Sequence, residues 1–188
     1  LPHIDFNIIR DNPKVFMGYS DTNISHLFCY KAGVVSFYGP AIMLEFAENG
    51  GMFPYVVQSL HRTLFSSDVI GEIEPDTEGW TMERLEWADS ALQRQRRKLT
   101  PSNGWKFLQG SGLRQGRLIG GCIDVFDWAR GTELFPNDWK DAVLFLEASE
   151  DVPPPDFVKS FLRVFAAMGI LRQLSGILFG RPYDREER

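Results

Sequence analysis

Residues 14–38 constrain the fold more than any other part of the chain. An apolar run between Pro13 and Gly18 predicts a short buried strand. Residues 20–33 then supply helix-capping residue types, apolar side chains at helical spacing and a closing glycine. A second apolar run at 34–38 predicts another strand. Strand, sharp turn, helix and strand form a βαβ unit, which implies a parallel sheet covered by helices.

The rest of the chain contains further helical and strand patterns. Helical spacing of apolar residues predicts helices over 51–65, 83–98 and 156–169. Short apolar runs predict strands over 117–119, 142–146 and 174–179. The composition changes near Ser66, where we place a domain boundary. The predicted fold class is α/β: part of a parallel-sheet N-terminal domain, residues 1–66, followed by a smaller mixed α+β C-terminal domain, residues 67–188.

Composition excludes several kinds of partner. Hydrophobic residues make up 44% of the chain and the net charge is −5, so we expect a globular protein that binds neither a nucleic-acid polymer nor a membrane. Cys29 and Cys122 lie in apolar surroundings and fit a reducing compartment. Since no signal peptide is visible, we expect a cytoplasmic protein. Histidine and cysteine do not fall at ligand spacing and no phosphate-binding glycine motif is present, so we expect no metal and no cofactor.

Ser20 stands at the predicted strand-to-helix turn. A serine there has its hydroxyl directed out of the sheet, and amides at the helix N-terminus can stabilise an oxyanion. The match to Gly-x-Ser-x-Gly is incomplete, because Asp21 and Thr22 replace the later small residues. From the local pattern alone, a helix-capping role for Ser20 is favoured over a nucleophilic one.

Other polar and aromatic residues are candidates for a site. Glu147 directly follows the apolar run at 142–146, where catalytic groups of α/β sheets often lie, although a carboxylate returning to solvent is the favoured alternative. His26 lies nearly two helical turns from Ser20, too far to act as its base, so we expect it to be structural or exposed rather than catalytic. The three tryptophans around the middle segment could stack on a ligand or pack a loop onto the core: Trp80, Trp87 and Trp105.

Several segments, taken in order, resemble one family. Residues 9–21, 30–34 and 38–40 resemble the nucleophile region of the LD-carboxypeptidase family, and later blocks continue the resemblance at 116–122, 144–150 and 176–181. Matching order and spacing across nearly the whole chain are far more specific than any single motif.

The resemblance implies a serine peptidase. The family uses Ser, His and Glu, which makes Ser20 the nucleophile and Glu147 the residue that orients the histidine. The amide of Asp21 would contribute to the oxyanion hole. The family includes murein tetrapeptide carboxypeptidases and microcin C self-immunity proteins. In the immunity branch a tryptophan loop stacks on a nucleobase, and Trp87 is the corresponding choice here.

We therefore expect a serine carboxypeptidase or amidase that removes a terminal D-amino acid from murein peptides in cell-wall recycling. One alternative is an immunity hydrolase that cuts peptidyl-nucleotides, and another is a non-catalytic fragment or binding module. Family members are often dimers, which makes a homodimer an expectation.

The chain departs from the family at both ends. The family's oxyanion Gly-Gly turn precedes the stretch that matches this chain, and its catalytic histidine follows the Gly-Arg block, whereas this chain stops at Arg188. On this resemblance, residues 1–66 are the C-terminal part of the nucleophile-bearing domain. Residues 67–188 carry the triad glutamate and are incomplete at their C-terminus, so the chain alone would be inactive.

Overall fold

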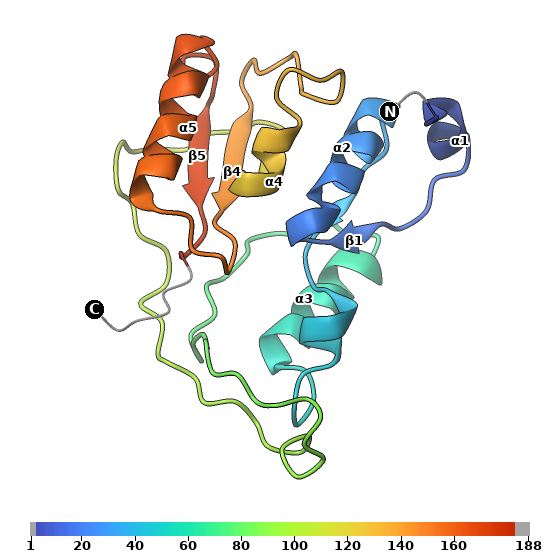
Figure 1. Ribbon diagram of the computed structural model, residues 1–188, viewed down its shortest axis with the longest axis vertical. Helices are drawn as coiled ribbons and strands as arrows, with labels where there is room; N and C mark the ends of the chain where they lie inside the picture. The colour runs from blue at the N-terminus through green and yellow to red at the C-terminus, as the bar shows by residue number, and fades with distance from the viewer. Residues whose placement is uncertain (1–2, 183–188) are drawn as a thin grey trace. The chain divides into compact units, whose positions relative to one another are not determined.

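The computed structural model describes residues 3–182 (Figure 1). The chain forms two compact units. The first unit comprises Leu1–Gly39 and Leu113–Arg188, and the second comprises Pro40–Gly112. This division by contacts within the chain does not coincide with the predicted domains 1–66 and 67–188, which stay a prediction. None of the helices in the described range is long and apolar enough to cross a membrane.

The N-terminal part of the first unit confirms the predicted βαβ arrangement. Its elements are α1 (Phe6–Asp11), β1 (Met17–Gly18), the 3-10 helix η1 (Ser20–Thr22), α2 (Asn23–Ala32) and β2 (Phe37–Tyr38). Strands β1 and β2 pair in parallel, with Gly18 opposite Tyr38, but each is only two residues long and thus shorter than predicted. Gly33 ends α2 in the left-handed conformation at φ 76°, as its position in the sequence predicted.

The rest of the first unit contains a three-stranded parallel sheet in the order β3-β4-β5. Its elements are β3 (Leu118–Cys122), α4 (Ile123–Trp128), β4 (Val143–Glu147), α5 (Pro155–Ala167) and β5 (Gly176–Phe179). Figure 1 shows α5 running along β5, with α4 beside β4. The predicted strands near 117, 142 and 174 and the helix near 156 are thus confirmed, and the fold class is α/β with parallel sheets. Helix α4 had not been predicted.

An aromatic cluster forms the core beside this sheet. Phe161 and Phe165 lie one turn apart on α5 and their ring centroids are 4.2 Å apart. They pack with three aromatic residues from α4 and the segment after it: Phe126, Phe135 and Trp139. Full burial of one such side chain stabilises a fold by about 1.5–3 kcal/mol, so this cluster anchors α4 and α5 against the sheet.

The second unit contains the π-helix η2 (Ile42–Phe46), α3 (Pro54–Leu64) and a long irregular segment. Helix α3 confirms the prediction over 51–65. The helix predicted over 83–98 is wrong, because the segment consists of turns and irregular chain. Local side-chain bonds to the backbone compete with helix formation there: Asp89 accepts from the Ala91 amide at 2.9 Å, and Glu86 from the Ala88 amide at 3.1 Å.

Two glycines allow β3 to approach its neighbours closely. A Cβ atom on Gly120 would lie 1.7 Å from the carbonyl oxygen of Phe145 in β4. A Cβ atom on Gly121 would lie 2.1 Å from the side-chain oxygen of Asn23, the first residue of α2. Both glycines also have positive φ angles, 152° and 135°. The contact between β3, β4 and the start of α2 therefore depends on the absence of side chains at these positions.

Replacing Gly120 by alanine is expected to destabilise the protein by about 3 kcal/mol or more, because the new methyl group meets backbone that cannot move aside. Gly176→Ala is the matched control. Gly176 also lies in a strand of the sheet, as the first residue of β5, but a Cβ atom there meets nothing within 4 Å. The substitution Gly176→Ala should therefore change the free energy of unfolding by no more than about 0.5 kcal/mol. Urea unfolding of both variants measures the difference, and equal free energies of unfolding would contradict the close approach.

Candidate active site

Ser20 begins the turn between β1 and α2 in an unusual conformation. Its φ angle is +56°, in the left-handed region that few residues other than glycine adopt. The capping interpretation of Ser20 is wrong, because the N-cap residues are Tyr19 for η1 and Thr22 for α2, and neither position has a side-chain cap bond. Strained backbone of this kind persists where the surrounding structure enforces it, often at functional sites.

The amides of this turn have different partners. The Ser20 amide donates to the Tyr38 hydroxyl at 3.3 Å, and the Thr22 amide donates to the Tyr19 carbonyl at 3.3 Å. The Asn23 amide donates to the carbonyl of Ser20. Among the described residues, the Asp21 amide has no acceptor. An amide with no partner next to a serine on a sharp turn can donate to a developing oxyanion.

Glu147 ends β4 and pairs with Cys122, the last residue of β3. The hydroxyl of Tyr38 donates to Glu147 Oε1 at 2.6 Å. The same hydroxyl accepts from the Ser20 amide, so one side chain connects the serine turn to the end of β4. Two of the predicted site residues, Ser20 and Glu147, are thus brought into one cluster of the first unit.

Burial and the negative charge of Glu147 act on the neighbouring acids. Burial is the main cause that raises the pKa of Tyr38 above its usual range, and the hydrogen bond to Glu147 and its charge add to it. Burial likewise raises the pKa of the Cys122 thiol to about 11, again with a contribution from Glu147. Near neutral pH both groups therefore keep their protons, and Tyr38 remains a hydrogen-bond donor.

His26 has a structural role, which is one of the two that its spacing predicted. Its Nε2 lies 2.9 Å from the Gly18 carbonyl and its Nδ1 lies 2.8 Å from the Ser36 hydroxyl. Since a carbonyl can only accept, Nε2 carries the proton and Nδ1 accepts from Ser36. The ring also contacts Phe16 edge-on, with centroids 4.9 Å apart. Both ring nitrogens are hydrogen-bonded, so His26 links β1 to the segment before β2.

The pH dependence of stability should report on His26. Burial lowers the pKa of His26 below its ordinary value of 6.5, so the unfolded chain binds the proton more tightly than the folded one. The stability that neutral His26 contributes is complete above 6.5 and is lost as the pH falls below it. We expect the free energy of unfolding to drop between about pH 7.5 and pH 5.5, and to drop less in His26→Gln. Equal pH dependence in urea titrations of the two proteins would contradict this.

Trp87 lies in the second unit and is half exposed, so it is not packed into a core. It lines a shallow hollow of about 360 Å³ together with four residues of the same unit: Met43, Ala47, Asn49 and Gln93. The Gln93 side-chain amide donates to the Trp87 carbonyl at 3.4 Å. The hollow offers an aromatic face with amide groups beside it, which suits a flat polar ring.

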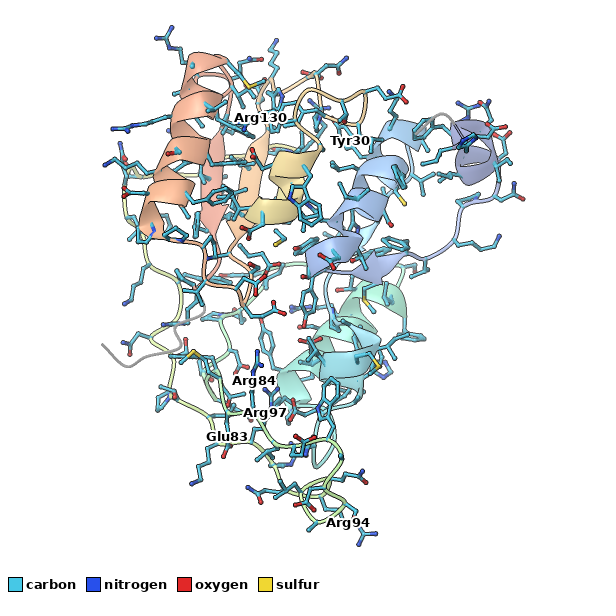
Figure 2. The ribbon with its side chains drawn as sticks, in the orientation of Figure 1. Tyr30, Glu83, Arg84, Arg94, Arg97 and Arg130 are labelled. Atoms are coloured by element: carbon cyan, nitrogen blue, oxygen red, sulfur yellow. The ribbon has the colours of Figure 1, made fainter. Side chains whose placement is uncertain are left out.

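A buried ion pair holds the segment that carries Trp87. Arg97 donates through two nitrogens to the carboxylate of Glu48, whose side chain is only 3% exposed. Arg97 also donates to the Glu83 carbonyl at 3.3 Å, and Figure 2 shows these two residues close together. A bidentate guanidinium bond of this kind fixes geometry as well as charge. The bond of Arg97 to the Glu83 carbonyl closes the segment between 83 and 97 into a loop.

Some residues of the site had not been identified from the sequence. Tyr38 was noted only as part of a segment that resembles a family, and Cys122 was noted only as a member of such a segment and as a cysteine in apolar surroundings, so neither was assigned a role in a site. A tyrosine that ends one strand has no sequence feature that identifies its partners 18 and 109 residues away. Within the described part of the chain, no group of three or more His, Cys, Asp or Glu side chains could hold a metal ion.

The fold and this cluster define a class: an α/β protein with a strained serine at a strand-to-helix turn and a carboxylate at the end of a neighbouring parallel sheet. Comparison with protein families gives the particular family. Residues 1–39 match the LD-carboxypeptidase N-terminal domain, and residues 115–188 match the LD-carboxypeptidase C-terminal domain. The chain belongs to the LD-carboxypeptidase family, as the resemblance in its sequence predicted.

Curated relatives and solved structures agree with this assignment. The chain is 29% identical to the microcin C7 self-immunity protein of Escherichia coli, over 96% of this chain and 52% of that protein. It is also 29% identical to a putative carboxypeptidase of Vibrio cholerae, with the same two coverages. The crystal structure of an MccF-like protein from Streptococcus pneumoniae in complex with AMP is similar, with a TM-score of 0.79 and 29% identity over 91% of this chain and 54% of that one. The chain thus spans about half the length of the relatives that it matches.

Proposed function

We propose that this chain carries the nucleophile and the carboxylate of a serine carboxypeptidase or amidase that removes a terminal D-amino acid from murein peptides. Ser20 is the nucleophile, Glu147 orients the histidine base and the Asp21 amide donates to the oxyanion. One observation carries the proposal: Ser20 is held at φ +56° on a sharp turn and is joined to Glu147 through a single intervening hydroxyl. Membership of the LD-carboxypeptidase family supports the same chemistry.

The proposed reaction follows the logic of a serine triad. A histidine takes the proton of the Ser20 hydroxyl, and the oxygen attacks the scissile carbonyl. The Asp21 amide stabilises the tetrahedral oxyanion, while the carboxylate of Glu147 stabilises the imidazolium. The histidine then gives its proton to the leaving amine, and water hydrolyses the acyl-enzyme. His26 does not fit the role of base, because Gly18 and Ser36 engage both of its nitrogens. The base in this proposal is the histidine of the family's triad, which in the family follows the Gly-Arg block.

Substitution of the two catalytic candidates tests this reaction, in a protein that contains them together with the histidine base. Ser20→Ala should lower turnover of a murein tetrapeptide by about 10⁶-fold. Glu147→Ala should lower it by about 10⁴-fold, because the histidine loses its orienting partner. Ser111→Ala, at an exposed position of the second unit, should leave turnover unchanged. Mass spectrometry after a fluorophosphonate probe should find a single adduct on Ser20, and turnover by Ser20→Ala would end the proposal.

A peptidyl-nucleotide is the second candidate substrate, and the half-exposed Trp87 with its hollow favours it. The microcin immunity relative and the AMP complex of the similar structure add support. In this case Trp87 would stack on the nucleobase, and cleavage would fall at the amide that links peptide and nucleotide.

Trp87→Ala separates the two substrates. Loss of one stacking contact costs about 1–3 kcal/mol, so kcat/KM for a peptidyl-adenylate analogue should fall by about 10- to 100-fold, while kcat/KM for a murein peptide changes little. Trp105→Ala is the matched control, because Trp105 is another exposed tryptophan of the second unit and lies outside the hollow. Equal losses for both substrates, or for both variants, would remove Trp87 from nucleobase recognition.

Two expectations on cellular context remain proposals. We infer a cytoplasmic location from the two cysteines, which are both buried and free and fit a reducing compartment. We also infer a homodimer, for which family membership is the support.

A further inference from the structure

We infer that Tyr38 is a positioning residue of this site, which fixes Ser20 and Glu147 relative to one another through its hydroxyl group. The inference rests on the proposed serine-peptidase function. It assigns to Tyr38 a role that is exerted through its two hydrogen-bond partners, Ser20 and Glu147.

The directions of the two hydrogen bonds follow from the groups involved. A backbone amide can only donate and a carboxylate can only accept. The Tyr38 hydroxyl therefore accepts from Ser20 at 3.3 Å and donates to Glu147 at 2.6 Å. A bond of a neutral hydroxyl to a charged carboxylate is among the short and strong ones. Rotation of the turn around Ser20 or of the Glu147 side chain would break one of the two bonds.

The ring of Tyr38 is held in place from two sides. Its centroid lies 5.3 Å from that of His26 and 5.2 Å from that of Phe145. His26 is itself bound to the Gly18 carbonyl, and Gly18 pairs with Tyr38 between β1 and β2. Phe145 precedes Glu147 by two residues on β4, so both side chains leave the same face of the strand. The ring is thus held by one contact from α2, the helix that follows Ser20, and by one contact from β4, the strand that ends in Glu147.

The bond to Tyr38 also gives the amides of Ser20 and Asp21 different roles. Because the Ser20 amide is occupied by Tyr38, it does not point at a substrate carbonyl. The Asp21 amide, which has no acceptor among the described residues, is left as the donor for the oxyanion. Tyr38 therefore helps to hold Ser20 in its left-handed conformation and separates the structural amide from the catalytic one.

Tyr38→Phe removes the hydroxyl and keeps the ring. We expect kcat to fall by about 10- to 100-fold, with KM changed less than about twofold, the size seen when partners that orient catalytic groups are lost. The rate of fluorophosphonate labelling at Ser20 should fall in parallel. Tyr30→Phe is the matched control: the Tyr30 hydroxyl accepts from Arg117 at 3.4 Å, and its loss should change neither rate.

Carbon-13 NMR of proteins labelled at the tyrosine Cζ tests the bridge without using activity. The Tyr38 resonance is assigned by its loss in Tyr38→Phe. In the wild type it should not titrate up to about pH 11, because burial and Glu147 hold the proton on the phenol. In Glu147→Gln its pKa should move back toward the ordinary value, since the carboxylate contribution is gone.

The outcomes separate the inference from the function on which it rests. If Ser20 is labelled equally fast in the wild type and in Tyr38→Phe, or if Glu147→Gln leaves the Tyr38 titration unchanged, the inference is overturned and the proposed function stands. If a protein that contains these residues together with the histidine base shows no adduct on Ser20, the proposed function fails and the catalytic role of Tyr38 fails with it. The inference is supported if Ser20 is labelled more slowly in Tyr38→Phe but not in Tyr30→Phe, and if the pKa of Tyr38 is lower in Glu147→Gln than in the wild type.

Discussion

The close approach of β3 to β4 and to the start of α2 is the constraint on which the site depends. Gly120 and Gly121 make room for the Phe145 carbonyl and for the Asn23 side chain. Asn23 is fully buried, and within the described residues its amide group has no hydrogen-bond partner. An unpartnered buried amide costs about 1–3 kcal/mol, so this contact is maintained against a stability cost. Its consequence is that the turn after β1 lies against β3, whose last residue is paired with Glu147.

The parts of the fold that local pattern determines were predictable from the sequence. The run before Glu147 is apolar because Leu144 and Leu146 enter the core, while Phe145 on the other face is partly buried against Tyr38. The phenylalanines of α5 recur at helical spacing because one face packs on the sheet. The prediction of a helix over 83–98 was wrong because two interactions hold this segment in a non-helical conformation. They are the long-range ion pair of Arg97 with Glu48 and the local bond of Asp89 to the backbone. Helix α4 was missed because it follows β3 with no intervening turn residue.

Only part of the site could be predicted from the sequence in this way. Ser20 could be recognised from its place between an apolar run and a helix, but its strained φ angle could not, since neighbouring residues in space enforce it. Glu147 could be recognised as the residue that ends a buried strand. What joins them could not, because Tyr38 acts through a backbone amide and a carboxylate that are remote in sequence from one another. Candidate chemistry is thus local in sequence, whereas its positioning is a property of the packed fold.

The candidate catalytic residues and the candidate ligand-stacking tryptophan lie in different compact units. The ranges that match the family domains, 1–39 and 115–188, nearly coincide with the first unit, which holds Ser20, Tyr38 and Glu147. Residues 40–112, which form the second unit and hold Trp87, lie between the matched ranges. Irregular segments tolerate sequence change better than the strands that carry a catalytic group. The ion pair of Arg97 with the buried Glu48 nevertheless gives the Trp87 segment a defined shape. Selection between a murein peptide and a peptidyl-nucleotide is therefore expected to act through this second unit, with the serine chemistry of the first unit unchanged.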